Sequence, residues 1–147
     1  MPFVKRDDAQ IATVGRGGYV LADFDAALTG ARALVLATGS EVGLALAARD
    51  MLAKDGVNVR VVSLPCTNVF DRQDAGYREA VLPRGVPRVA IEAGVTDFWR
   101  KYVGAVDDPH AAVVGIDTFG ESAPAPVLFK HFGFTPEHVV AAVRGIL

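Results

Sequence analysis

Two kinds of hydrophobic pattern alternate along the chain. Short runs rich in Val, Leu, Ile and Ala predict strands, and stretches with an apolar residue every three or four positions predict amphipathic helices. Because strands and helices alternate, we expect an α/β fold. Its three layers would be a mostly parallel β-sheet with helices on both faces.

Five apolar runs are predicted to be strands, and each is bounded by glycine, proline or a polar residue. Their ranges are 18–23, 31–39, 57–65, 87–93 and 111–117. The apolar run within 31–39 predicts a central strand, whereas the run at 18–23 predicts a short strand at the edge of the sheet.

The first long helix is expected over residues 41–54, with Ser40 as its N-cap and Gly56 as its C-terminal stop. Its buried stripe is predicted to contain Leu44, Ala48, Met51 and Leu52.

A second helix is predicted after a cap at Asp71 and ends before Pro83. In a third helix, Phe98 and Tyr102 are four residues apart, so we expect one buried face to contain both rings, with Gly104 ending the helix.

Two further helices are expected near the C-terminus. Ser122 would open the first of them, and Thr135 would cap the second, with Pro136 at its first helical position.

The composition indicates one compact domain, because 51% of the 147 residues are hydrophobic and 22% are charged. A net charge of −2 disfavours nucleic acid and anionic membranes as partners. With neither a signal-like leader nor a long apolar run, we expect a cytoplasmic protein. Cys66 is the only cysteine, so no internal disulfide can form, and we expect it to be a small packed residue of a loop.

The turn Thr38-Gly39-Ser40 is a candidate anion site, because it joins a strand to the N-terminus of a helix. However, it lacks the glycine pattern of a dinucleotide fold and the lysine of a P-loop, and Glu41 would repel a phosphate. The sequence favours a capped turn over an anion site.

Other residue types predict no site of chemistry. His110, His131 and His138 do not have the spacing of metal ligands, so we expect no metal site. Ser122 lacks the GxSxG context of a nucleophile, which leaves no predicted catalytic residue.

Several longer strings occur in the order found in one enzyme family. They are RGGYVL (16–21), ATGSEV (37–42), VVSLPCTNVFDRQDAGYREAVLP (61–83), RVAIEAG (88–94), WRKYVG (99–104) and GIDTFGESAPAPVLFKHFGFTPEHVV (115–140). Together they resemble the C-terminal third domain of transketolase. The corresponding domains of keto-acid dehydrogenases and deoxyxylulose-phosphate synthase share the architecture, but the FGESAP and FGFT strings argue against them.

The resemblance implies that residues 31–147 form the C-terminal domain, and that residues 1–30 are a lead-in from a missing middle domain, including the short edge strand. Full-length transketolases are homodimers that transfer a two-carbon ketol unit between ketose and aldose phosphates in the pentose phosphate pathway. Their thiamine diphosphate and divalent metal, magnesium or calcium, are held through a GDG motif that this sequence lacks.

The resemblance therefore implies a non-catalytic part that binds no cofactor itself and serves domain packing and dimer contacts. The alternative is a free-standing module that binds a small molecule or anion at Thr38, Gly39 and Ser40. The two hypotheses predict different amounts of exposed apolar surface, because a domain without its neighbours should expose an apolar patch where they dock.

Overall fold

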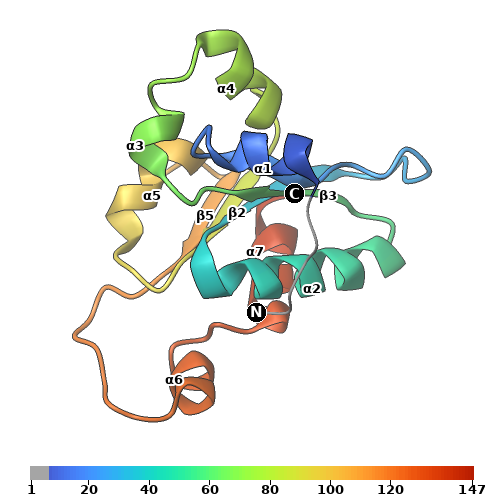
Figure 1. Cartoon of the computed structure of the whole chain (residues 1–147). Coiled ribbons are helices and arrows are strands. Elements are labelled where there is room, and N and C mark those ends of the chain that lie inside the picture. Colours follow the sequence, from blue (N-terminus) through green and yellow to red (C-terminus); the bar gives the residue numbers. More distant parts are fainter. Residues whose placement is uncertain (1–6) are drawn as a thin grey trace.

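A computed structural model describes residues 7–147 and contains one five-stranded sheet (Figure 1). The strands are β1 (Tyr19–Ala22), β2 (Arg32–Ala37), β3 (Asn58–Ser63), β4 (Arg88–Ile91) and β5 (Ala111–Val114). They lie in the order β1-β3-β2-β4-β5. β1 is antiparallel to β3, and the other pairs are parallel. All five predicted strands are present, with β2 central and β1 at the edge.

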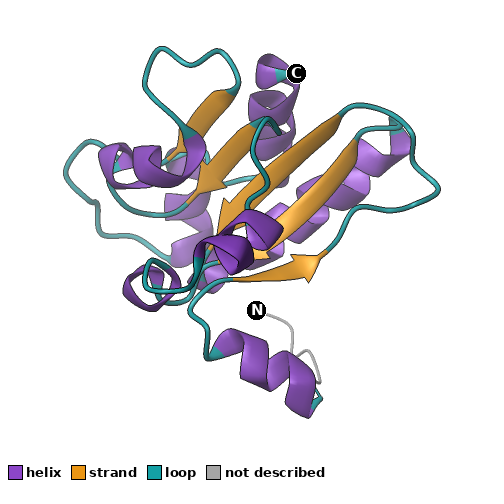
Figure 2. Ribbon diagram, turned by 90° about the horizontal axis from the view of Figure 1, so that it is seen from above, coloured by secondary structure: helices purple, strands orange, loops and turns teal. Residues whose placement is uncertain are grey.

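The strands bury side chains on both faces, because successive residues point to opposite sides of a sheet. In β2, Val35 contributes to one hydrophobic core and Leu36 to the other. Helices α2 (Val42–Lys54) and α7 (Pro136–Ile146) cover the first face. Helices α3 (Thr67–Phe70), α4 (Ala75–Val81) and α5 (Thr96–Val103) cover the second (Figure 2). The predicted three-layer α/β fold is confirmed.

Helix α7 begins where the sequence predicts. The side chain of Thr135 accepts a hydrogen bond from the backbone N–H of His138 at 3.2 Å, and Pro136 occupies the first turn. This satisfies one of the N–H groups that have no partner within the helix, while proline needs none.

Helix α2 begins differently from the prediction. A 3₁₀ turn, η1 (Gly39–Glu41), precedes it, and Ser40 is not its N-cap. The Ser40 hydroxyl instead donates to the Glu41 carboxylate at 3.0 Å. Glu41 occupies the N-cap position without a capping side-chain bond.

The buried stripe of α2 was only partly predicted. Ala48 and Leu52 are buried, but Leu44 and Met51 are half-buried at its margin. Gly56 follows the helix with φ +78°, as expected of a C-terminal stop.

Two predictions about the second face are wrong. Asp74, not Asp71, caps α4 by accepting from the Tyr77 N–H at 2.8 Å. Asp71 instead accepts bonds from Lys101 and from the Tyr102 hydroxyl, which ties α3 to α5. Phe98 is 50% exposed whereas Tyr102 is 5% exposed, so the two rings do not share a buried face.

The segment between β5 and α7 protrudes from the sheet (Figure 1). Helix α6 (Ala125–His131) has no buried residue, and its N-cap is Pro124 rather than the predicted Ser122. Helix α1 (Asp8–Val14) also has no buried residue, and the sequence analysis did not predict it. Asp7 and Gln10 close a capping box that supports its first turn.

Between residues 7 and 147, none of the helices combines the length and the apolar character that crossing a membrane requires.

Candidate functional site

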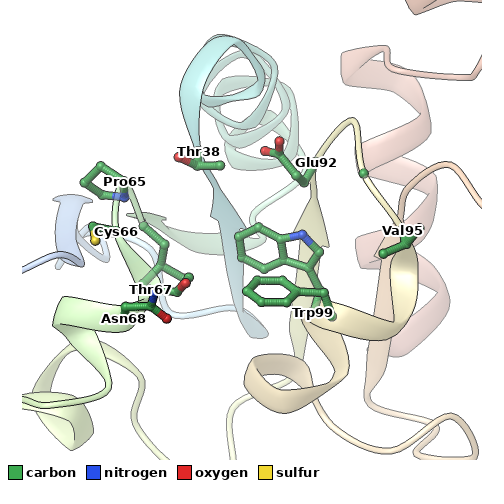
Figure 3. Close-up of a pocket in the computed structure, with 11 residues that line it drawn as sticks. Thr38, Pro65, Cys66, Thr67, Asn68, Glu92, Val95 and Trp99 are labelled. Atoms are coloured by element: carbon green, nitrogen blue, oxygen red, sulfur yellow. The ribbon is translucent and has the colours of Figure 1, made fainter. Parts of the chain in front are cut away.

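A cavity of about 490 Å³ opens at the carboxyl ends of β2, β3 and β4 (Figure 3). Residues that follow the three strands and residues of α3 and α5 line it: Thr38, Leu64, Pro65, Cys66, Thr67, Asn68, Glu92, Gly94, Val95, Phe98 and Trp99. Its size is that of a site for a small molecule.

The position of the cavity follows from the order of the strands. The connection from β2 to β3 contains α2 on one face, and the connection from β3 to β4 contains α3 and α4 on the other. The two connections diverge from the centre of the sheet and leave a crevice at its carboxyl edge. In open α/β sheets, ligands bind at such a reversal of strand order.

Glu92 is the titratable carboxyl group of this cavity and comes directly after β4. Burial, followed by the nearby charge of Glu41, raises the pKa of Glu92 to about 7. Its Oε2 atom is buried and has no hydrogen-bond partner among the described residues. Such a buried, unpartnered oxygen disfavours the charged form.

Glu41 lies after β2 and is only 3% exposed. The hydroxyl of Ser40 donates to both oxygens of its carboxylate. Because β2 and β4 are adjacent and parallel, the carboxyl groups that follow them lie at the same edge of the sheet. Two acidic side chains therefore lie near each other at this edge, with Glu92 lining the cavity and Glu41 close to it.

Aromatic rings form one wall of the cavity. Trp99 is 3% exposed, and its ring centroid lies 5.7 Å from that of the half-exposed Phe98 in an edge-to-face arrangement. Figure 3 shows Trp99 across the cavity from Cys66 and Asn68. The cavity thus combines an apolar wall with an acidic end.

Cys66 is exposed, which corrects the expectation of a packed residue. Its backbone is held, because its N–H donates to the Gly17 carbonyl and its own carbonyl accepts from the N–H groups of Val69 and Phe70. These bonds fix the start of α3 without requiring the thiol, which is left at the edge of the cavity.

The predicted turn lies at this same edge. Thr38 lines the cavity, Gly39 has φ +53°, and the hydroxyl of Ser40 is bonded to Glu41. The Glu41 and Glu92 side chains beside the turn oppose the approach of an anion. Anion binding by Thr38, Gly39 and Ser40 stays a prediction.

The three histidines lie apart from the cavity. Nδ1 of His110 is 2.9 Å from the Ile146 carbonyl oxygen, and Nδ1 of His138 is 2.9 Å from that of Gly133. The His131 ring packs edge-on against Phe132. Each histidine therefore has a contact outside the cavity that accounts for its position.

The residues of the crevice do not fit a metal-bound diphosphate. Two carboxyl groups, Glu41 and Glu92, come together there. Within residues 7–147, no group of three or more His, Cys, Asp or Glu side chains is arranged to hold a metal ion. No lysine or arginine lines the cavity to neutralise phosphate oxygens.

Sequence reasoning missed Glu92 as a site residue. Its signal was present in RVAIEA, where a carboxylate directly follows an apolar strand. In a parallel sheet that position is at the carboxyl edge, where ligands bind. Glu41 was considered only as a residue of the first helical turn.

Fold and crevice together define an open, doubly wound α/β domain. The family described as "Transketolase-like TK C-terminal domain" matches residues 17–135. The chain belongs to this family, which confirms the resemblance found in the sequence.

Individual relatives agree with this assignment. The chain is 52% identical over 145 residues to transketolase 1 of Escherichia coli and 56% identical over 143 residues to transketolase 2 of Pasteurella multocida. It covers 21% of each relative, with 97% of its own length aligned. The solved transketolase of Leishmania mexicana matches with a TM-score of 0.81 and 43% identity, over 93% of this chain and 19% of that one. The chain thus spans about a fifth of the length of these proteins.

Proposed function

We propose that this chain is the C-terminal domain of a thiamine-diphosphate-dependent transketolase of the cytoplasm. The complete enzyme would transfer a two-carbon ketol unit between ketose and aldose phosphates in the pentose phosphate pathway. The observation that carries the proposal is the family match over residues 17–135, together with transketolase relatives about five times as long.

Within that enzyme, this part is proposed to be non-catalytic and to serve domain packing and homodimer contacts. Thiamine diphosphate and magnesium or calcium would belong to the preceding domains, and the isolated chain would be inactive. Residues 1–30 are proposed as the lead-in from the middle domain. Strand β1, at the end of this segment, pairs with β3 of the sheet.

An exposed arm supports the packing role. We define the arm as residues 117–127, all of which are exposed. At its centre the side chain of Phe119 is 96% exposed, and Val127 near its end is 56% exposed. A phenylalanine that is 96% exposed gains little from its own fold, so we infer that the arm packs against the remainder of the enzyme.

A chimera tests the proposal directly. The C-terminal fifth of E. coli transketolase 1 would be replaced by this chain, to which it is 52% identical. We expect ketol transfer within about tenfold of the parent, because changes that leave an interface intact cost little in transition-state binding. Turnover would be measured with a ketose phosphate donor and an aldose phosphate acceptor.

Two controls accompany the chimera. The parent enzyme without its C-terminal fifth should lose activity or assembly, and the isolated chain with thiamine diphosphate and magnesium should show neither turnover nor heat of binding. A folded but inactive chimera would contradict the assignment, and turnover by the isolated chain would contradict the non-catalytic role.

The alternative function is a free-standing module that binds an anion at Thr38, Gly39 and Ser40. The observation in its favour is that Thr38 lines the cavity. Titration with ribose 5-phosphate or inorganic phosphate tests it. Saturable binding that is lost in Ser40→Glu would favour this module, because the added carboxylate repels the ligand.

A further inference from the structure

The crevice has an acidic character that the proposed function does not use. Among the eleven residues that line it, Glu92 is the one with a carboxyl group, and none is lysine, arginine or histidine. Glu41 adds a second carboxyl group close to Glu92. Arg88, four residues before Glu92, and Arg100, next to Trp99, do not line the cavity, and the charge of Arg100 lies near Asp117.

Glu92 is a carboxyl group that lacks a counter-ion. The influences on its pKa are burial and the like charge of Glu41, and both raise it. The unpartnered Oε2 atom agrees with this. A half-buried carboxylate whose buried oxygen has no partner costs free energy, which a bound cation or hydrogen-bond donor would offset.

The cavity wall beside Glu92 is apolar and can contact the hydrocarbon part of a cationic ligand. Phe98 and Trp99 present aromatic surface, and Val95 and Leu64 add apolar surface. Aromatic faces attract an ammonium group through the ring quadrupole as well as contacting a hydrocarbon body. The volume of about 490 Å³ suits a compact molecule rather than a peptide.

We propose that the crevice at the carboxyl edge of β2, β3 and β4 binds a small organic cation. Its ammonium group would lie against the carboxyl group of Glu92, and its apolar body against Phe98 and Trp99. Such a site does not depend on ketol transfer. It would give the domain a ligand of its own at the position where the fold provides a crevice.

Binding would depend on pH, because the cation interacts with the charged form of Glu92. With a pKa of about 7 in the free protein, part of this group is protonated at neutral pH. Affinity should therefore rise from about pH 6 to about pH 8. The other ionisable groups that face this region are Glu41 from η1 and the Cys66 thiol before α3.

Three matched fragments test the proposal. Benzylamine, benzyl alcohol and benzoate share one ring and differ in the charge of one group. The fluorescence of Trp99, the only tryptophan, reports occupancy, and alkylation of Cys66, the only cysteine, reports protection of the opposite wall. For fragments of this size we expect Kd values that are roughly millimolar at best.

We expect benzylamine to bind at least about tenfold more tightly than benzyl alcohol, with benzoate weakest. Benzylamine should also slow the alkylation of Cys66. In Glu92→Gln the preference for the amine should disappear, while Asp50→Asn, an exposed carboxyl group on α2, should keep it. Thermal unfolding of both variants confirms that they are folded.

Four results would overturn the proposal. They are no fluorescence response to benzylamine at tens of millimolar, equal affinity for the three fragments, a preference for benzoate, and an amine preference that survives in folded Glu92→Gln. A preference for benzoate would also support the anion site at the Thr38 turn instead.

Discussion

The sheet and the arm of residues 117–127 use apolar residues in opposite ways. In β2, the residues from Ala33 to Ala37 are all buried, and each contributes to one of the two cores. In the arm every residue is exposed, including Phe119. The sheet is thus explained by contacts within the chain. In the arm, Asp117 accepts hydrogen bonds from Thr96, but the exposed residues that follow it are not explained in this way.

The strings shared with the family therefore fall into two groups: those that the fold of this chain explains and those that it does not. The string ATGSEV lies where β2 turns into α2, so the fold of this chain accounts for it. The string FGESAP lies within the arm, where the chain makes no buried contact. The arm's residues therefore point to neighbours outside the described chain, which is the basis of its proposed docking role.

The largest expected effect comes from a phenylalanine next to the arm but inside the core. Phe134 is 2% exposed and packs against Phe129, with ring centroids 5.8 Å apart. Phe134→Ala should lower the free energy of unfolding by roughly 3–5 kcal/mol. Urea denaturation measures this, and a loss below about 1 kcal/mol would mean that the packing of Phe134 is not as described.

An effect of intermediate size should come from Glu92. A raised folded-state pKa means that the folded protein holds the proton more tightly, so the stabilisation is complete below about pH 4.5 and is lost as pH rises through about 7. Between these values the wild type should lose roughly 1–3 kcal/mol relative to Glu92→Gln.

Urea denaturation of both proteins across this pH range tests the effect, with Asp50→Asn as the exposed control. Parallel pH profiles for the wild type and Glu92→Gln would show that Glu92 titrates normally.

The cap of α7 should contribute about 1 kcal/mol. Thr135→Ala removes the oxygen that accepts from the His138 N–H, and that N–H has no other helical partner. Thr135→Ser should restore most of the loss because it keeps the hydroxyl. An alanine variant as stable as the wild type would show that water replaces the cap.

The smallest effect on stability is expected in the arm itself. Phe119→Ala should change the free energy of unfolding by less than about 0.5 kcal/mol, because a fully exposed ring has no contacts to lose. The same change in the transketolase chimera should weaken assembly, as seen by sedimentation and by turnover. A large loss of stability in the isolated chain would show that the arm packs on this domain.

Patterns that depend on neighbours in sequence were predictable. Local propensity and turn chemistry predict the five strands, the cap at Thr135 and the stops at Gly56 and Gly104. Where two nearby residues are equally suited to one role, the sequence does not show which of them takes it. Asp71 and Asp74 are both suitable caps by sequence, and only the position of Lys101 and Tyr102 commits Asp71 to another contact.

Predicting the site from the sequence requires more knowledge of tertiary contacts than predicting the fold does. The sequence pattern places the Thr38 turn at the correct edge of the sheet but does not reveal Glu92, because which strand ends are adjacent is known only from the strand order. Phe98 was predicted to be buried by its spacing from Tyr102, yet α5 turns it toward the cavity. Helix α1 has no buried face, so it lacks the pattern that reveals a helix.

The lengths of the outer strands bear on how copies of this chain can associate. The strands at the two borders of the sheet, β1 and β5, have four residues each. Such short borders offer few free backbone groups to a strand from another molecule, which protects against growth of the sheet and aggregation. Self-association of this chain is therefore expected to occur through side chains rather than by continuation of the sheet.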